Sequence, residues 1–232
     1  MMTEREKMIL EKLISKKQVT VKELASELYV SEPSVRRDLA ALEKRNLLKR
    51  VYGGAVIDES ALSRNMIPFM LREMEQGSAK IVIAKKAADL VRDGDVIFLD
   101  ASTTAYTMIP FLAGKKNVTV VTNGVRALEK LAEYEINAIS TGGALVGGCL
   151  ALVGDEAYKT IEAINANIAF FSCRGLSEGG YLTDISAPEN NVRRMMMRRS
   201  EKSYLLLANE KKGKKYYHNL CHESELDGII TD

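Results

Sequence analysis

The sequence predicts an α/β protein in which an N-terminal winged helix-turn-helix is joined to a larger, mainly parallel α/β domain. Two short amphipathic helices separated by a tight turn occupy residues 19–42, and a basic, glycine-containing segment follows at residues 46–57. From about residue 79 onward, short apolar strands alternate with helices, which is typical of a parallel sheet covered on both faces. We therefore expect a first domain over residues 1–57 (the head), a linker over 58–78 and a second domain over 79–232.

Composition limits the class of protein. The 232 residues are enough for two cores, and 46% hydrophobic with 28% charged residues is the balance of a soluble globular protein. No apolar run approaches the ~18 residues of a membrane-spanning helix, and the charged segment at residues 1–7 does not resemble a signal peptide. We expect a cytoplasmic protein.

The cysteines carry little functional signal. Cys149, Cys173 and Cys221 lie far apart, and the chain has only two histidines. This number and spacing fit neither a disulfide framework nor a zinc site. We expect buried or incidental thiols, no metal and no cofactor.

The net charge of +2 hides an asymmetry between the two predicted domains. Residues 1–57 contain 12 Lys/Arg and 8 Asp/Glu, whereas residues 58–232 contain 21 and 23. A basic head on a slightly acidic second domain favours polyanion binding by the head. An ordinary basic surface gives a similar imbalance, so charge alone does not decide.

The first two helices begin with capping residues. Thr3 precedes a helix expected over residues 3–15 and has Glu6 at capping-box spacing, while Thr20 precedes the second helix. Tyr29 and Val30 form the following turn. The apolar residues of both helices recur at helical spacing and are expected to face one core: Ile9, Leu10, Leu13, Ile14, Val21, Leu24, Ala25 and Leu28.

The third helix combines an apolar face with a basic one. Ser31 is expected to cap it, and Val35, Leu39 and Leu42 recur at the spacing of a core-facing stripe. Small residues beside an arginine suit close approach to base edges and phosphates of DNA. A solvated basic face is the alternative interpretation. The outer face comprises Pro33 (in the first turn), Ser34, Arg37, Ala41 and Lys44, with Arg36 on its flank.

The segment at residues 46–57 predicts a β-hairpin wing, because two short apolar runs flank a basic tip. Lys49, Arg50 and Tyr52 are expected to contact the DNA backbone. Gly53 and Gly54 permit a positive φ or a close approach of the backbone to a phosphate.

At this point a family resemblance is clear. Residues 31–56, SEPSVRRDLAALEKRNLLKRVYGGAV, resemble the signature of DeoR-type transcriptional regulators. The chain departs from that signature at Ser34, where threonine is common, and at Tyr52, where histidine is common. The resemblance implies a DNA-binding head, and the two departures bear on which operator sequence it selects.

The second domain reads as alternating helices and strands. Helices are expected near residues 79–91, 102–114, 123–133, 155–164 and 188–200. Strands are expected at residues 96–100, 118–122, 136–140, 168–173, 204–208 and 228–231. The connector before them is expected to be partly helical.

Polar and small residues follow three successive strands of this domain. In parallel sheets, ligands bind beyond the carboxyl ends of the strands, and the N–H groups of a helix N-terminus suit a phosphate. Three such loops predict a polar site for a small phosphorylated ligand; the alternative is that these residues only cap helices. The loops are Asp100–Thr104 (with Ser102 and Thr103), Thr122–Gly124 (with Asn123) and Thr141–Gly143 (with Gly142).

The second domain also resembles the sensor domain of DeoR-type regulators, which is related in fold to ribose-5-phosphate isomerase. The matching segments are DGDVIFLDASTT, VTVVTNGVRAL, the TGG turn, LALVG and GYLTD. The resemblance implies that a sugar phosphate controls DNA binding. Such a controlling small molecule is called the effector below. It places the effector site at Asp100, Ser102, Thr103, Thr104, Asn123, Gly142 and Gly143, and with less support at Thr183, Asp184, Glu189 and Lys212.

Arg174 is the departure that most affects the expected ligand. Relatives commonly carry GADGI where this chain has Ser172–Leu176, so an arginine replaces an aspartate. Its guanidinium can bind an anionic ligand in a bidentate manner, or it can pair with Asp184 or Glu189. The segment from Arg193 to Arg199 reads most simply as a helix with core methionines and a basic face.

Three functions are weighed. The first is a DNA-binding regulator, a repressor of a carbohydrate-use operon, acting as a homo-oligomer on double-stranded operator DNA under control of a phosphorylated sugar. The second is a sugar-phosphate isomerase carrying the head, with Asp100, Asp184 and Glu189 as candidate bases. The third is a protein-interaction module. We expect the first, with no catalytic residues.

Overall fold

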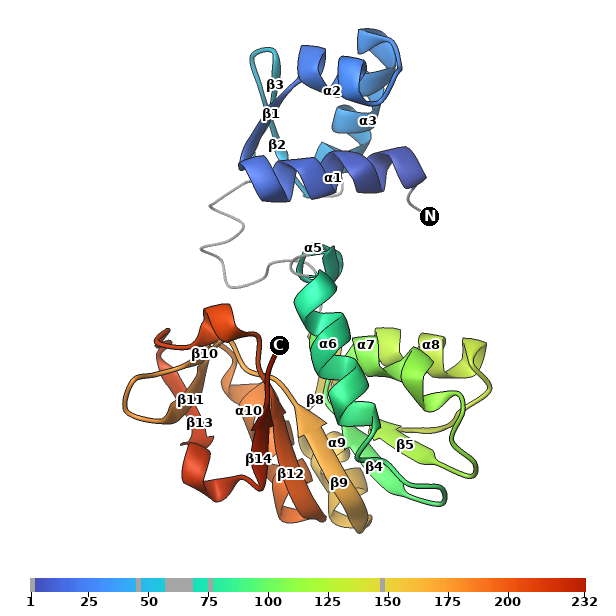
Figure 1. The fold of residues 1–232 in the computed structure, drawn as a ribbon, viewed down its shortest axis with the longest axis vertical. Helices are drawn as coiled ribbons and strands as arrows, with labels where there is room; N and C mark the ends of the chain where they lie inside the picture. Colours follow the sequence, from blue (N-terminus) through green and yellow to red (C-terminus); the bar gives the residue numbers. More distant parts are fainter. Residues whose placement is uncertain (1–2, 45–46, 57–68, 75–76, 147–148) are drawn as a thin grey trace. The chain divides into compact units, whose positions relative to one another are not determined.

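The computed structural model describes residues 3–44, 47–56, 69–74, 77–146 and 149–232. The chain divides into two compact units, Met1–Glu75 and Gln76–Asp232. The second unit is called the sensor domain below, and each unit is considered by itself (Figure 1). Residues 58–68 and 75–76 of the expected linker lie outside the described residues. A short helix, α5 (Phe69–Met74), belongs to the first unit.

The head contains three helices and three short strands. The helices are α1 (Glu4–Lys16), α2 (Val21–Glu27) and α3 (Glu32–Lys44), and the strands are β1 (Gln18–Thr20), β2 (Lys49–Val51) and β3 (Gly54–Val56). The strands pair antiparallel in the order β1-β3-β2. The expected hairpin is confirmed as β2–β3. The sequence did not reveal β1, because three residues are too few to show a strand period.

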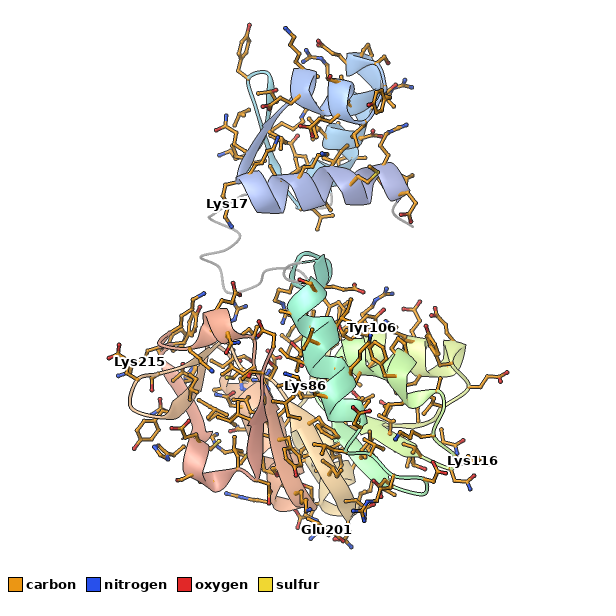
Figure 2. The ribbon with its side chains drawn as sticks, in the orientation of Figure 1. Lys17, Lys86, Tyr106, Lys116, Glu201 and Lys215 are labelled. Atoms are coloured by element: carbon orange, nitrogen blue, oxygen red, sulfur yellow. The ribbon has the colours of Figure 1, made fainter. Side chains whose placement is uncertain are left out.

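Capping residues fix the starts of α1 and α2, as predicted. The Thr3 hydroxyl accepts a hydrogen bond from the Glu6 backbone N–H at 3.1 Å, and Glu6 accepts one from the Thr3 N–H at 2.7 Å. Thr20 and Glu23 repeat this arrangement at 3.1 and 3.0 Å. Each capping box satisfies donors that the first turn leaves unpaired. Lys17 ends α1 with a φ of 64° (Figure 2).

The core of the head is built from the predicted apolar stripes. Among its fully buried side chains are Ile9, Leu10, Leu13, Leu24, Val35, Leu39 and Leu42. The side chain of Ile14 lies outside the described residues. Arg5 of α1 binds Asp38 of α3 through two hydrogen bonds, of 2.6 and 3.0 Å, and so joins the first helix to the third.

The sensor domain is an α/β unit. Its helices are α6 (Gly77–Ala88), α7 (Thr103–Leu112), α8 (Val125–Glu133), α9 (Asp155–Glu162) and α10 (Ala187–Arg198). Its main sheet consists of β4 (Val96–Leu99), β5 (Thr119–Thr122), β6 (Asn137–Ser140), β9 (Ala166–Phe171), β12 (Ser200–Leu206) and β14 (Gly228–Ile230). All of these elements were predicted, although β9 starts two residues earlier and β12 four residues earlier than expected.

The main sheet is parallel throughout, in the order β14-β12-β9-β4-β5-β6. Neighbouring residues of one strand, such as Ile97 and Phe98, are both fully buried, so helices cover both faces, as predicted. In Figure 1, α6 crosses in front of the sheet, whereas α10 lies behind it. The strand order reverses between β4 and β9, which makes their carboxyl ends a topological switch point.

Two smaller sheets were not predicted. One is the hairpin of β7 (Ala144–Val146) and β8 (Ala151–Val153). The other has the order β10-β11-β13 and consists of Gly175–Leu176, Tyr181–Asp184 and His218–His222. Their strands are short and lie between loops, so neither shows a clear two-residue period. Among the described residues, no helix is long and apolar enough to cross a membrane.

Candidate DNA interface and effector site

The outer face of α3 carries the predicted basic side chains. Arg36, Arg37 and Lys44 are exposed, whereas Val35 and Leu39 on the opposite side are fully buried. The Ser31 carbonyl accepts a hydrogen bond from the Val35 N–H at 3.2 Å, so α3 begins where expected. The rest of the predicted outer face comprises Pro33, which is exposed, and Ser34 and Ala41, which are half-buried.

Arg37 is the least engaged of the arginines on this face. Its Nη2 lies 3.5 Å from the Ser34 hydroxyl, a weak contact. Arg36 pairs with Glu32 at 3.2 Å along the helix. Exposed ion pairs contribute little to stability, so this pair holds the Arg36 side chain only weakly. Arg37 therefore presents an exposed guanidinium that is held only by its weak contact with Ser34.

Arg50 connects the wing to α3. Its backbone N–H donates to Glu43 Oε1 at 2.9 Å, and its Nε donates to Oε2 at 2.8 Å. The backbone hydrogen bond, followed by the side chain and charge of Arg50, lowers the pKa of Glu43 below its ordinary value. The geometry assigns Arg50 a positioning role for the wing in this structure, in addition to the backbone contact predicted for it.

The tip of the wing is open. Tyr52 is fully exposed, Lys49 is exposed, and Gly53 has a φ of 77°, a conformation that favours glycine. Gly54 differs from its neighbour because it is buried, and a Cβ there would lie 2.1 Å from the Val19 carbonyl oxygen. We predicted that Gly54 allows the backbone to approach a phosphate. In the structure, glycine is needed there because β3 packs closely against β1.

The switch point of the main sheet brings Asp100, a predicted effector residue, beside the end of β9. Asp100 follows β4, and Ser172 follows the adjacent strand β9. Asp100 is buried, and its carboxylate accepts hydrogen bonds from the Ser102 N–H at 3.1 Å and the Ser172 N–H at 3.3 Å. The carboxylate thereby fixes the loops that leave both strands.

Sequence analysis did not predict the buried position of Arg193 in α10. Its side chain is 6% exposed. Nε donates to Asp100 at 2.9 Å, Nη1 donates to Asp184 at 3.0 Å, and Nη2 lies 3.6 Å from Glu189. The expectation of a basic surface face is therefore wrong at this position. A signal was present: Glu189, Arg193 and Met196 occur at i, i+4 and i+7, the spacing of one buried helix face.

One guanidinium thus serves three buried carboxylates. Burial by itself lowers the pKa of Arg193, but the charges of Asp184, Asp100 and Glu189 outweigh it and raise the pKa above its ordinary value. Arg193 is consequently always charged. Its cluster ties together the end of β4, β11 and α10, and it uses the carboxylates that were predicted to line the ligand site.

The N-terminus of α7 keeps unpaired donors. The Ser102 hydroxyl caps the helix by accepting the Ala105 N–H at 3.2 Å. The backbone N–H groups of Thr103 and Thr104 have no acceptor within the described part of the chain. Helix N-termini of this kind bind anions through N–H groups and the helix dipole.

The N-terminus of α8 does not provide a second such site. The Val125 N–H donates to the Leu150 carbonyl, and the Gly124 N–H donates to the Thr122 hydroxyl, both at 3.0 Å. Asn123 donates to the Leu152 carbonyl at 3.0 Å, while its buried Oδ1 has no partner among the described residues. The expected open loop is therefore covered by the segment that leads into β8.

Gly142 and Gly143 lead the chain from β6 into the β7–β8 hairpin. Their φ values are 64° and 108°, and a Cβ on Gly143 would lie 2.5 Å from the Val153 carbonyl oxygen. Both glycines are accounted for by this path of the backbone. The prediction that they line an effector site remains a prediction.

Lys211, not Lys212, reaches the switch point. Its ammonium donates to the Cys173 carbonyl at 2.9 Å and to the Ser172 hydroxyl at 3.2 Å. Lys212 is exposed, and Lys215 projects at the periphery of the sensor domain (Figure 2). The short helical turn at Asn209–Lys211 directs Lys211 inward, and an effector contact by Lys212 stays a prediction.

Arg174 lies three residues beyond the end of β9. Its Nε is 3.8 Å from Asp184 Oδ1, and its side chain is 25% exposed. The predicted pairing with Asp184 is thus present but long, and pairing with Glu189 is not seen among the described residues. Thr183, also implied by the resemblance, is buried and donates to the Gly175 carbonyl at 3.1 Å.

The three cysteines are free and buried, as expected. Desolvation raises the pKa of Cys173 to about 11 and that of Cys221 to about 12, so both are thiols at neutral pH. The Cys149 thiol lies 3.3 Å from Glu189 Oε1. Within the described ranges, no group of His, Cys, Asp and Glu side chains is arranged to hold a metal ion.

Two family matches together cover nearly the whole chain. Residues 5–61 match the DeoR-like helix-turn-helix domain, and residues 75–232 match the DeoR C terminal sensor domain. The chain belongs to the DeoR family of transcriptional regulators. The family resemblance stated from residues 31–56 and from the strand ends is confirmed. As a DeoR-family regulator, the chain pairs a DNA-binding head with a sensor domain.

Curated relatives extend over the full chain. YulB of Bacillus subtilis, an uncharacterized HTH-type transcriptional regulator, is 34% identical and matches 100% of this chain and 89% of its own length. GolR of Listeria innocua, also an HTH-type transcriptional regulator, is 34% identical over 99% of this chain and 90% of its own length. The lactose phosphotransferase system repressor of Staphylococcus epidermidis is 30% identical over 95% of this chain and 88% of its own length.

A solved structure has a similar fold over much of this chain. eIF2B delta from Chaetomium thermophilum has a TM-score of 0.51 at 17% identity and covers 70% of this chain and 60% of its own. Ribose 5-phosphate isomerase A from Methanocaldococcus jannaschii has a TM-score of 0.46 at 19% identity. The match covers 60% of this chain and 55% of the isomerase chain.

Proposed function

We propose that this DeoR-family regulator represses a carbohydrate-use operon and that a phosphorylated sugar bound by its sensor domain changes its affinity for the operator. The observation that carries the proposal is the combination, in one chain, of an exposed arginine face on α3 with an unpaired helix N-terminus at a sheet switch point. The relative named as a lactose phosphotransferase system repressor supports the link to carbohydrate use.

The operator contacts are assigned by exposure and position. The start of α3, from Ser31 to Arg37, reads bases, and Lys44 lies further along the same face. Lys49 and Tyr52 of the wing contact the DNA backbone together with the N–H of Gly53. Phosphate contacts supply affinity that falls with salt, whereas base contacts supply sequence preference.

The effector is assigned to the switch point between β4 and β9. Its phosphate binds the free N–H groups of Thr103 and Thr104 at the N-terminus of α7, and Lys211 supplies a positive charge beside the end of β9. This position agrees with the rule that ligands of parallel sheets bind at the carboxyl ends of strands where the order reverses.

The effector controls the operator only if it binds the operator-bound and free forms of the protein unequally. We propose a homo-oligomer, because operator half-sites related by symmetry require more than one head. The site of action is the cytoplasm, where the operator is accessible.

The isomerase alternative requires a carboxylate base that is free to take a proton from substrate. Asp100 and Asp184 accept hydrogen bonds from Arg193, and Glu189 lies 3.6 Å from it. These contacts favour a structural role for all three carboxylates, in agreement with membership of a regulator family.

Arg37→Ala tests the DNA interface. We expect it to weaken binding to a duplex from upstream of the protein's own operon by about 1–3 kcal/mol and to relax base preference at one position. Fluorescence anisotropy with full-length protein measures both effects. Arg198→Ala serves as the control, because Arg198 is exposed on α10 of the sensor domain. Equal operator affinity of the Arg37 and Arg198 variants would contradict the assigned face of α3.

A further inference from the structure

The guanidinium of Arg174 has unused hydrogen-bonding capacity. Its single charge contact is the 3.8 Å approach of Nε to Asp184, and its terminal Nη1 and Nη2 groups have no acceptor among the described residues. An arginine side chain that is three-quarters buried normally pairs its planar donors with a carboxylate or phosphate. The described part of the sensor domain supplies no such partner for Nη1 and Nη2.

Asp184 does not need Arg174. Its Oδ2 accepts a hydrogen bond from Arg193 at 3.0 Å, and its Oδ1 accepts the Ile185 N–H at 2.7 Å. Asp184 therefore keeps a cation and a donor when Arg174 turns elsewhere. Breaking a buried ion pair is unfavourable when it leaves a buried charge without a partner. Moving the Arg174 side chain to a ligand does not do so, because Asp184 keeps its bond to Arg193.

Arg174 lies at the same switch point as the proposed phosphate site. It follows β9 by three residues, with Ser172 between, and Ser102 follows the adjacent strand β4 by three residues. Asp100 links these two loops by accepting N–H groups from both Ser102 and Ser172. The N-terminus of α7 and the backbone of Arg174 thus follow neighbouring strand ends.

We infer that Arg174 binds a second acidic group of the effector, so that the ligand is a phosphorylated sugar with another oxyanion, either a second phosphate or a carboxylate. The inference rests on the proposed effector site and specifies its ligand class. The first phosphate occupies the N-terminus of α7, and the second oxyanion accepts two hydrogen bonds from the planar fork of Arg174.

Matched ligand pairs test this assignment in full-length protein. The pairs are fructose 1,6-bisphosphate with fructose 6-phosphate, and 6-phosphogluconate with glucose 6-phosphate; isothermal titration calorimetry gives each Kd. In the unmodified protein we expect the doubly acidic member of at least one pair to bind about tenfold tighter than its partner. The pair that shows the preference distinguishes a second phosphate from a carboxylate.

Arg174→Gln and Arg198→Gln complete the test. Arg174→Gln is expected to reduce the affinity ratio within the preferred pair to about one, whereas Arg198→Gln retains the ratio of the unmodified protein. Binding of single phosphates without a preference for the doubly acidic member, or a preference that survives Arg174→Gln, would overturn the inference alone. Failure of every phosphosugar to bind would overturn the proposed effector site and this inference with it.

Discussion

Arg193→Met is expected to destabilise the sensor domain by about 3–5 kcal/mol. The guanidinium is the cation that lies between Asp100, Asp184 and Glu189, and all three carboxylates are buried. Methionine fills a similar volume but leaves these negative charges close together in a poorly hydrated environment. Removing one partner of a buried ionic cluster is far more damaging than removing the whole cluster.

Urea unfolding of the full-length protein measures this effect, with the sensor-domain transition followed separately from that of the head. Arg198→Met removes an arginine from the same helix at an exposed position and is expected to change stability by less than about 0.5 kcal/mol. Arg193→Lys keeps the charge but loses the planar fork of the guanidinium. The stability of this variant should therefore fall between those of the Arg193→Met and Arg198→Met variants. If Arg193→Met unfolded at the same urea concentration as Arg198→Met, the cluster would not have the role assigned to it.

Gly54→Ala is expected to destabilise the head by about 3 kcal/mol and to abolish specific operator binding. The added Cβ would lie 2.1 Å from the Val19 carbonyl oxygen and 3.0 Å from Thr20 Cα, and neither backbone atom can move away cheaply. Pairing of β3 with β1 would be lost, and with it the packing that buries Val19 and Ala55 and supports the wing.

Gly53→Ala is the matched control for this effect. Its Cβ would meet nothing within 4 Å, so only the φ of 77° opposes it, at a cost of about 1 kcal/mol. Thermal unfolding monitored by circular dichroism compares the two variants, and the sensor-domain transition provides an internal reference. A Gly54→Ala head as stable as the Gly53→Ala head would show that β1 and β3 are not packed as described.

Much of the head was predictable because its signals are local. The stripe of Val35, Leu39 and Leu42 and the capping boxes at Thr3 and Thr20 depend on residues within one or two turns of each other. The same holds for the strands of the main sheet, where runs such as residues 96–99 are apolar because both faces are covered. Arg36 and Arg37 were placed on the exposed face by the same helical period.

The remaining features depend on contacts between residues far apart in sequence. Arg193 joins Asp100 across 93 residues, so the local pattern of α10 did not identify its partner. The need for Gly54 arises from Val19 in another strand, and the covering of α8 arises from the segment at residues 150–152. In these three cases the partner that decides the role of the residue lies in another element of the fold.

The sensor domain therefore contains two kinds of polar group: charged side chains that pair with one another, and donors that have no acceptor among the described residues. Asp100, Asp184, Glu189 and Arg193 satisfy one another and hold the strand ends in place. The backbone N–H groups of Thr103 and Thr104 and the terminal Nη1 and Nη2 groups of Arg174 have no acceptor within the described residues. In the site proposed above, a ligand with negative charge would meet these donors without disturbing the buried cluster, as a preorganised anion site requires.

Operator binding by full-length protein, with and without phosphosugars, tests the central claim most directly. A labelled duplex from upstream of the protein's own operon is titrated at two salt concentrations, beside a random duplex of equal length. The account predicts tight, salt-sensitive binding to the upstream duplex that changes when a phosphosugar is added. Equal affinity for both duplexes, or operator binding that no phosphosugar alters, would contradict it.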